Sequence, residues 1–199
     1  MDTDRNTARL ALATASAVVA ADLAYVAFAA WGQPFGSLND VLNAASAVLA
    51  GWLAWSLRGR AGRVAAALAL VGAAVAVVGS ALVLSGATGW FRAAFVSAVG
   101  LGLLGPAVVA TSRSLGAAGA MSRRLTRIGV VAGLVMTMGL LAAVPAAIGF
   151  DDPATAPAWA WLPYAGWVGA FLLYPVWAAG LGIGRSRPAV SGSGTSTIG

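Results

Sequence analysis

The chain lacks the side chains on which most catalytic and metal sites depend. Its 199 residues include no cysteine, histidine, glutamate or lysine. These absences exclude cysteine nucleophiles, histidine general bases, Schiff-base lysines and metal sites built from histidine or cysteine. An intramembrane aspartyl protease would need two carboxylates that share a site, and only one aspartate falls deep in an apolar run. We therefore expect a protein that is not an enzyme and that uses no metal and no cofactor.

Charged residues are also scarce, at 9% of the chain, whereas hydrophobic residues make up 60%. Soluble domains contain roughly 45–50% apolar residues. The hydrocarbon core of a bilayer is about 30 Å thick, so a spanning helix needs about 20 mostly apolar residues. The sequence predicts an all-α, polytopic integral membrane protein, a bundle of six transmembrane helices at approximately residues 10–31, 41–57, 64–85, 93–111, 128–149 and 161–183.

The basic residues orient this predicted bundle. All twelve are arginines, and with a cytoplasmic amino terminus only Arg92 falls on the outer side. Positive charges in short loops mark the cytoplasmic side, so we predict a protein of the cell membrane with both termini in the cytoplasm. The arginines are spread over separate loops and form no single basic stripe, which argues against nucleic-acid binding. The expected partner is the lipid bilayer.

The predicted transmembrane domain covers residues 1–184, and residues 185–199 form a Gly/Ser/Thr-rich segment that we expect to be a disordered cytoplasmic tail. A signal peptide is the alternative for the first apolar run, because arginines precede it and Ala27-Phe28-Ala29 resembles a cleavage site. The run of about 20 residues exceeds the 7–15 apolar residues of a signal peptide, and Asp22 interrupts it. We therefore favour a retained first helix.

Two local patterns suggest structural roles. Ser37 followed by Asp40 resembles a capping box, with Asp in place of the usual Glu or Gln, and predicts the start of the second helix. Pairs of small residues four positions apart allow helix backbones to approach closely. Such pairs occur at Ala13/Ala17, Gly72/Ala76, Ala98/Gly102 and Gly129/Gly133.

Asp22 stands alone among apolar residues in the stretch SAVVAADLAYVAF. At about 1.5 Å per residue it lies about 19 Å from Arg9 and about 13 Å from Trp31, slightly outward of the bilayer midplane. A charged aspartate at a helix centre costs roughly 2.5–3.5 kcal/mol, and such side chains usually face the bundle interior. Asp22 is therefore the first candidate for an intramembrane site.

Neighbours of Asp22 can be chosen by their spacing and depth. The side chains of Val18, Asp22, Tyr25 and Ala29 fall on one helical stripe, which we predict faces the core. The further candidates on other helices are Ser46, Ser80, Arg92 and Tyr174. Among these, Arg92 is the cation that could pair with Asp22.

Two prolines fall inside predicted helices, Pro106 and Pro175. Each removes a backbone donor and frees the carbonyl four residues earlier, at Gly102 and Phe171. Membrane helices tolerate such breaks where neighbouring groups or water satisfy the freed carbonyl. The prolines therefore predict helix breaks, which are either simple kinks or parts of a cavity wall.

Two hypotheses for function remain, and we favour the first because the sequence has no catalytic groups, no soluble domain and no second charge deep in an apolar run. The first is a non-catalytic membrane protein that supports or regulates another membrane component, as a partner of another membrane protein or as a homo-oligomer. The second is a small secondary transporter or channel in which Asp22 is a proton or cation site, as intramembrane carboxylates often are. Asp22 is either such a site or a neutral hydrogen-bonded link between helices.

Overall fold

The computed structural model describes residues 2–186, and all regular structure in this range is helical. The α-helices are α1 (Asp2–Trp31), α2 (Phe35–Ser56), α3 (Arg58–Ala61), α4 (Arg63–Leu84), α5 (Trp90–Ala117), α6 (Arg123–Thr137), α7 (Ala143–Ile148), α8 (Ala165–Trp167) and α9 (Tyr174–Ser186). Two 3-10 segments, η1 (Met138–Ala142) and η2 (Ala158–Tyr164), and one π-helical segment, η3 (Val168–Leu173), join the later helices. The predicted all-α class is confirmed.

Five helical segments of the described chain are long and apolar enough to cross a membrane, which indicates a multi-pass membrane protein in contact with lipid. They are Asp4–Trp31, Arg63–Leu84, Trp90–Ala117, Arg123–Ile148 and Ala158–Ser186. The remaining predicted span corresponds to α2, which has 22 residues, as α4 does. Polar residues Asn39, Asp40 and Asn43 at the start of α2 lower its hydropathy below that of the five.

Most observed helices extend beyond the predicted apolar runs. α1 begins at Asp2 and α5 continues to Ala117, because both helices include flanking polar residues. Arg113, predicted in a loop, is therefore helical. Of the predicted tail, Arg185 and Ser186 belong to α9, and residues 187–199 lie outside the described range.

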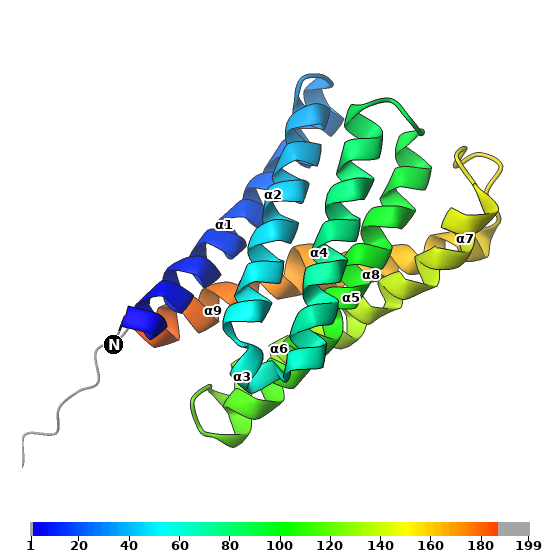
Figure 1. The fold of residues 1–199 in the computed structure, drawn as a ribbon. Helices are drawn as coiled ribbons and strands as arrows, with labels where there is room; N and C mark the ends of the chain where they lie inside the picture. The colour runs from blue at the N-terminus through cyan, green and yellow to red at the C-terminus, as the bar shows by residue number, and fades with distance from the viewer. Residues whose placement is uncertain (1, 187–199) are drawn as a thin grey trace, which may run out of the picture.

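The helices form a layered bundle in which α1, α2, α4 and α5 lie side by side in that order (Figure 1). The segments from α6 to α9 pack behind this layer. We call the end with α3 and residues 118–122 the α3 end, and the end with residues 32–34, 85–89 and 149–157 the far end. α1 and α9 lie together toward the α3 end, and the C-terminal segment of which η3 is part passes behind α2 and α4 and diverges from the far half of α1 (Figure 1).

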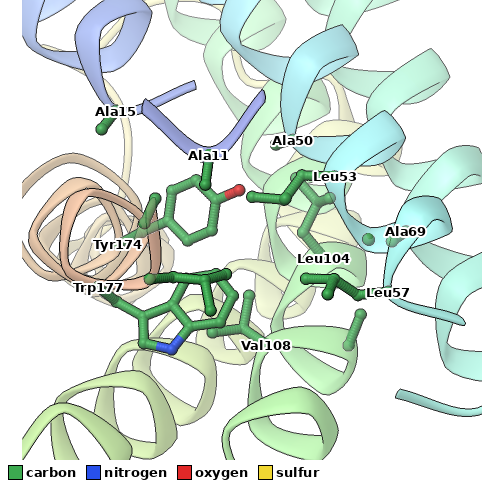
Figure 2. Close-up of a cluster of buried hydrophobic side chains, with 14 of the residues drawn as sticks. Ala11, Ala15, Ala50, Leu53, Leu57, Ala69, Leu104, Val108, Tyr174 and Trp177 are labelled. Carbon is green, nitrogen blue, oxygen red and sulfur yellow. The ribbon is translucent and has the colours of Figure 1, made fainter. Parts of the chain in front are cut away.

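The α3-end half of the bundle has a closed hydrophobic core. Figure 2 shows Tyr174 and Trp177 of α9 pointing toward Leu53 of α2 and toward Leu104 and Val108 of α5. The two aromatic side chains are almost fully buried, as is Leu53. Apolar side chains from α1, α2, α4, α5, α6 and α9 thus seal this half.

Close backbone contacts at small residues join the helices. A Cβ at Gly72 would collide with the carbonyl of Gly100, and one at Gly133 would collide with the carbonyl of Gly105. Three of the predicted small-residue pairs include a glycine at such a contact, which is how membrane helices gain close packing. The pair at Ala13 is different, because Ala13 is exposed.

Substitution of Gly100 should test this packing. A Cβ there would meet the backbone nitrogen of Ala76 and the carbonyl oxygen of Gly72, neither of which can move without shifting α4. We expect Gly100→Ala to lower the free energy of unfolding by about 1–3 kcal/mol, the usual cost of overpacking. Thermal unfolding in detergent, followed by tryptophan fluorescence, measures the change.

Gly59→Ala is the matched control, since no atom lies within 4 Å of a Cβ built there. Equal melting temperatures for the two variants would contradict the assigned α4–α5 contact.

Candidate functional site

A cavity of about 620 Å³ occupies the far-end half of the bundle. Its walls come from α1, the loop after it, α2, α4, α5, α8 and η3. The polar side chains in the lining are Asp22, Tyr25, Gln33, Asn39, Asp40, Asn43, Ser46, Ser80 and Ser97, and the aromatic ones besides Tyr25 are Phe28, Trp90, Trp167 and Phe171.

Asp22 lies on the α1 wall of this cavity and is half-buried. It is nine residues before the end of α1 at Trp31, which places it about 13 Å from that end. Among the described residues, no hydrogen bond or ion pair joins Asp22 to another side chain. The carboxylate is therefore free to bind an occupant of the cavity.

Asp40 is a second carboxylate in the cavity lining, and the capping role predicted for it is wrong. α2 begins at Phe35, before Ser37, and its N-cap residue is Pro34, which makes no side-chain capping hydrogen bond. Ser37 instead donates from its backbone N–H and its hydroxyl to Oε1 of Gln33, both at 3.3 Å. Asp40 lies in the second turn, half-buried, where its side chain lines the cavity.

A short chain of hydrogen bonds fixes the amides of α2. Nδ2 of Asn39 donates to the carbonyl oxygen of Ala21 on α1 at 2.8 Å. Nδ2 of Asn43 donates to Oδ1 of Asn39 at 3.0 Å, as the spacing of four residues on a helix allows. This arrangement leaves Oδ1 of Asn43 buried without a donor. A buried acceptor without a partner costs free energy, so a ligand that donates to it would relieve that cost.

Trp167 provides an unpaired donor on the opposite wall. Its Nε1 is buried and has no acceptor among the described residues. Trp167 directly precedes η3. The ring of Phe171, in η3, packs edge to face against the ring of Trp167, with 5.7 Å between the ring centroids. π-Helical turns are rare in proteins, and many of those that occur lie at functional sites. The position of η3 in this wall therefore supports a functional role for the cavity.

The floor between α4 and α5 carries two serines. Ser80 is buried on α4 and lines the cavity. Ser97 of α5 lies against Gly79, and its hydroxyl donates weakly to the carbonyl oxygen of Ala76 at 3.5 Å. The absence of a side chain at Gly79 lets Ser97 approach α4.

Four of the six predicted site residues meet in the cavity: Asp22, Tyr25, Ser46 and Ser80. Ser46 is tied to its own helix, since its hydroxyl donates to the carbonyl oxygen of Asn43 at 2.9 Å. Its contribution is therefore to the shape of the wall more than to hydrogen bonding.

Arg92 lies away from the cavity. It is exposed, and its guanidinium lies beside Gly149 at the far end. Its backbone N–H points at the Asp151 carboxylate, at 3.4 Å, and this carboxylate also accepts from Gly89 at 2.8 Å. The hypothesised pair with Asp22 does not form; the ion pair within residues 2–186 joins Arg185 and Asp4, at 3.5 Å.

Tyr174 also lies outside the cavity, in the closed core of the α3-end half. Its ring is fully surrounded, and its oxygen points toward α2 near Ala50 and Leu53 (Figure 2). Although its side chain is long, Tyr174 therefore packs in the core and does not line the cavity.

The two prolines have different surroundings. α5 runs without interruption through Pro106. Pro175, in contrast, directly follows η3 and the first residue of α9, so the π-helical turns occur where its missing N–H frees the Phe171 carbonyl.

The predicted core stripe on α1 is correct only for its first part. Val18 is buried and Asp22 half-buried, but Tyr25 is 57% exposed and Ala29 is exposed. Around Asp22 and Tyr25 the buried positions of α1 are instead Ala21 and Ala24.

The cavity is acidic in net charge. Asp22 and Asp40 contribute two carboxylates, and no arginine is among the lining residues. Among residues 2–186 no group of three or more potential ligands is placed to hold a metal ion. The arrangement thus offers two carboxylates as acceptors.

Comparison with known proteins finds no family model, no curated protein and no solved structure that matches this chain. The site is therefore interpreted from its own residues.

The Asn39 bond to α1 should stabilise the cavity wall. We expect Asn39→Ala to lower the free energy of unfolding by about 1–3 kcal/mol, because it removes the bond to Ala21 and a partner of Asn43. Thermal unfolding in detergent measures the loss. Asn6→Ala is the matched control, since Asn6 is an exposed asparagine of α1, one of the two helices that the Asn39 bond joins. A stability change no larger than that of Asn6→Ala would contradict the structural role of Asn39.

Proposed function

We propose that the protein is a small cation transporter of the cell membrane that binds its substrate at Asp22 and Asp40. The observation that carries the proposal is a cavity of about 620 Å³ with two carboxylates and no basic side chain in its lining. In this proposal the chain is a six-helix bundle with both termini in the cytoplasm and with the cavity in the outer half.

The position of α2 supports a sixth span. α2 packs along α1 on one side and α4 on the other, over 22 residues. A helix of that length covers about 33 Å, enough for the hydrocarbon core. Its polar first turns face the cavity, where water can solvate them, so they do not prevent insertion.

The orientation rests on the distribution of arginine. Arg58, Arg60 and Arg63 lie at the α3 end, whereas Arg92 lies at the far end. Positive residues in short loops stay in the cytoplasm, so the α3 end is the cytoplasmic one.

Cysteine labelling tests both the sixth span and the orientation, because the chain has no cysteine of its own. A membrane-impermeant maleimide applied to intact cells should label Gln33→Cys, which lies at the far end in the loop just before α2. The same reagent should leave Gly59→Cys in α3 unlabelled until the cells are lysed. Labelling of both variants, or of neither, would contradict a membrane-spanning α2. The opposite pattern would reverse the orientation.

Asp22 and Asp40 provide a mechanism for the proposed transport. A carboxylate holds either a proton or another cation, so exchange between the two at Asp22 would couple substrate movement to the proton gradient. Intramembrane carboxylates serve as proton relays in many transporters. The carboxylate at Asp22 lies deeper than Asp40, which is five residues from the start of α2. Asp40 would therefore receive the cation first and Asp22 would hold it.

Neutral variants of the two aspartates test this function. Purified protein in proteoliposomes is exposed to pulses of sodium, potassium or 2-phenylethylammonium, and currents are recorded on a solid-supported membrane, with empty liposomes as the baseline. We expect a current with at least one cation. Asp22→Asn should reduce it about tenfold or more, since a hydrogen bond to a charged group is worth about 1.5–3 kcal/mol. Asp40→Asn should reduce it in the same direction.

Asp152→Asn is the matched control, because Asp152 lies in the loop before η2 and accepts from the backbone of Ala154 at 2.9 Å. Its current should equal that of the unchanged protein. Equal currents for Asp22→Asn would remove Asp22 from the site. Saturable cation binding without any current would contradict transport and favour a protein that supports or regulates another membrane component.

A further inference from the structure

We propose that the substrate is an organic ammonium ion that has N–H donors and an apolar body. This inference rests on the proposed cation site and specifies its ligand. It depends on four features of the cavity: its size, its aromatic walls, its unpaired hydrogen-bonding atoms and the side on which it opens.

The size and walls of the cavity suit an organic molecule. Small-molecule sites have volumes of about 300–1,000 Å³ and mostly apolar linings with a few placed polar groups, a range that includes this cavity. A bare sodium or potassium ion would fill a small part of it and would leave the apolar lining without contacts. Tyr25, Trp167 and Phe171 instead present aromatic surface, and aromatic faces attract organic cations.

The acceptors in the lining favour an ion that can donate hydrogen bonds. Oδ1 of Asn43 is a buried acceptor without a donor, and the carboxylates of Asp22 and Asp40 are acceptors in the same cavity. A primary ammonium group has three N–H donors, whereas a quaternary ammonium group has none. A primary ammonium can therefore donate to the carboxylates of Asp22 and Asp40 and, once the Asn43 side chain turns toward the cavity, to its Oδ1, whereas a quaternary ion can donate to none of them.

α1 and the C-terminal segment that contains η3 diverge toward the far end (Figure 1), and both contribute lining residues, so we infer that the cavity opens between them. Each of these two elements has a strongly exposed lining residue, Tyr25 at 57% on α1 and Leu172 at 62% on η3. In a bundle that spans the bilayer this opening faces lipid. An ion with an apolar body could therefore reach the carboxylates from the bilayer itself.

An ammonium group of this kind belongs either to a free amine or to the headgroup of an aminolipid. The lining has no cation that would pair with a lipid phosphate. The experiment below separates the two sources.

Binding of four matched probes tests the inference. The protein is placed in phosphatidylglycerol nanodiscs, and binding is followed by the fluorescence of its tryptophans, two of which, Trp90 and Trp167, line the cavity. The probes are 2-phenylethylammonium, its N,N,N-trimethyl derivative, the uncharged 2-phenylethanol, and sodium. We expect 2-phenylethylammonium to bind about tenfold or more tightly than its trimethyl derivative, and the last two probes to show no saturable binding.

Asn43→Leu gives a second readout that a general loss of folding would not mimic. It should weaken the binding of 2-phenylethylammonium about tenfold while it leaves the trimethyl derivative unchanged, because only the first ion donates to Oδ1. Asn6→Leu is the matched control and should change neither, since Asn6 lies outside the cavity.

Addition of phosphatidylethanolamine to the nanodiscs identifies the source of the ammonium. Competition with 2-phenylethylammonium supports the inference with an aminolipid headgroup as the occupant. Unchanged binding supports it with a free amine. Equal affinities for the primary and the trimethyl ion, or sodium binding as tight as that of the amine, would overturn the inference and leave the cation site intact. If no cation binds, the proposed function itself is wrong.

Discussion

A carboxylate inside a bilayer must be hydrated, paired or neutral, because lipid offers it no hydrogen-bonding partner. This constraint explains the far half of the bundle. Asp22 lies about 13 Å from the end of α1 and has no partner among the described side chains, yet it borders a cavity of about 620 Å³. Asp40, Asn43 and Ser80 border the same space. Polar residues that would each be expensive in lipid thus share one cavity, and α2 can be polar at its start because it faces that cavity.

The C-terminal helix shows how one chain segment serves both the closed and the open half. Trp167, Phe171 and Tyr174 follow one another at spacings of four and three residues, which would put them on one face of a regular α-helix. The π-helical segment η3 lies between Trp167 and Tyr174 and has more residues per turn, so it changes the direction of the side chains that follow it. Trp167 and Phe171 line the cavity, and Tyr174 is buried in the core. The aromatic residues are similar, and the backbone decides which half of the bundle they occupy.

The sequence was sufficient for the helical class and for the positions of the apolar segments, because long apolar runs are strong and local signals. It also identified Asp22, whose cost in an apolar helix is equally local. The cavity was not predictable, since it depends on the angle at which α1 leaves the C-terminal segments. For the same reason the sequence does not show that Asp40, Asn43 and Trp167 line one cavity. The spacing of Asn39 and Asn43, one helical turn apart beside Asp40, was a signal for a polar face on α2 that local capping rules did not use.

The contacts at the α3 end limit how the cavity can change its width. α1 and α9 are joined there by the ion pair between Asp4 and Arg185. Gly182 adds a close contact, since a Cβ there would meet the Leu12 side chain at 2.7 Å. The closed core around Trp177 prevents separation of the helices in this half, because packed interiors resist small displacements. These contacts hold α1 and α9 together at the α3 end and, within residues 2–186, leave the far portions of α1 and η3 without a comparable ion pair. The π-helical turns next to Pro175 lie between those contacts and Trp167 of the cavity wall, at a position where helices commonly bend.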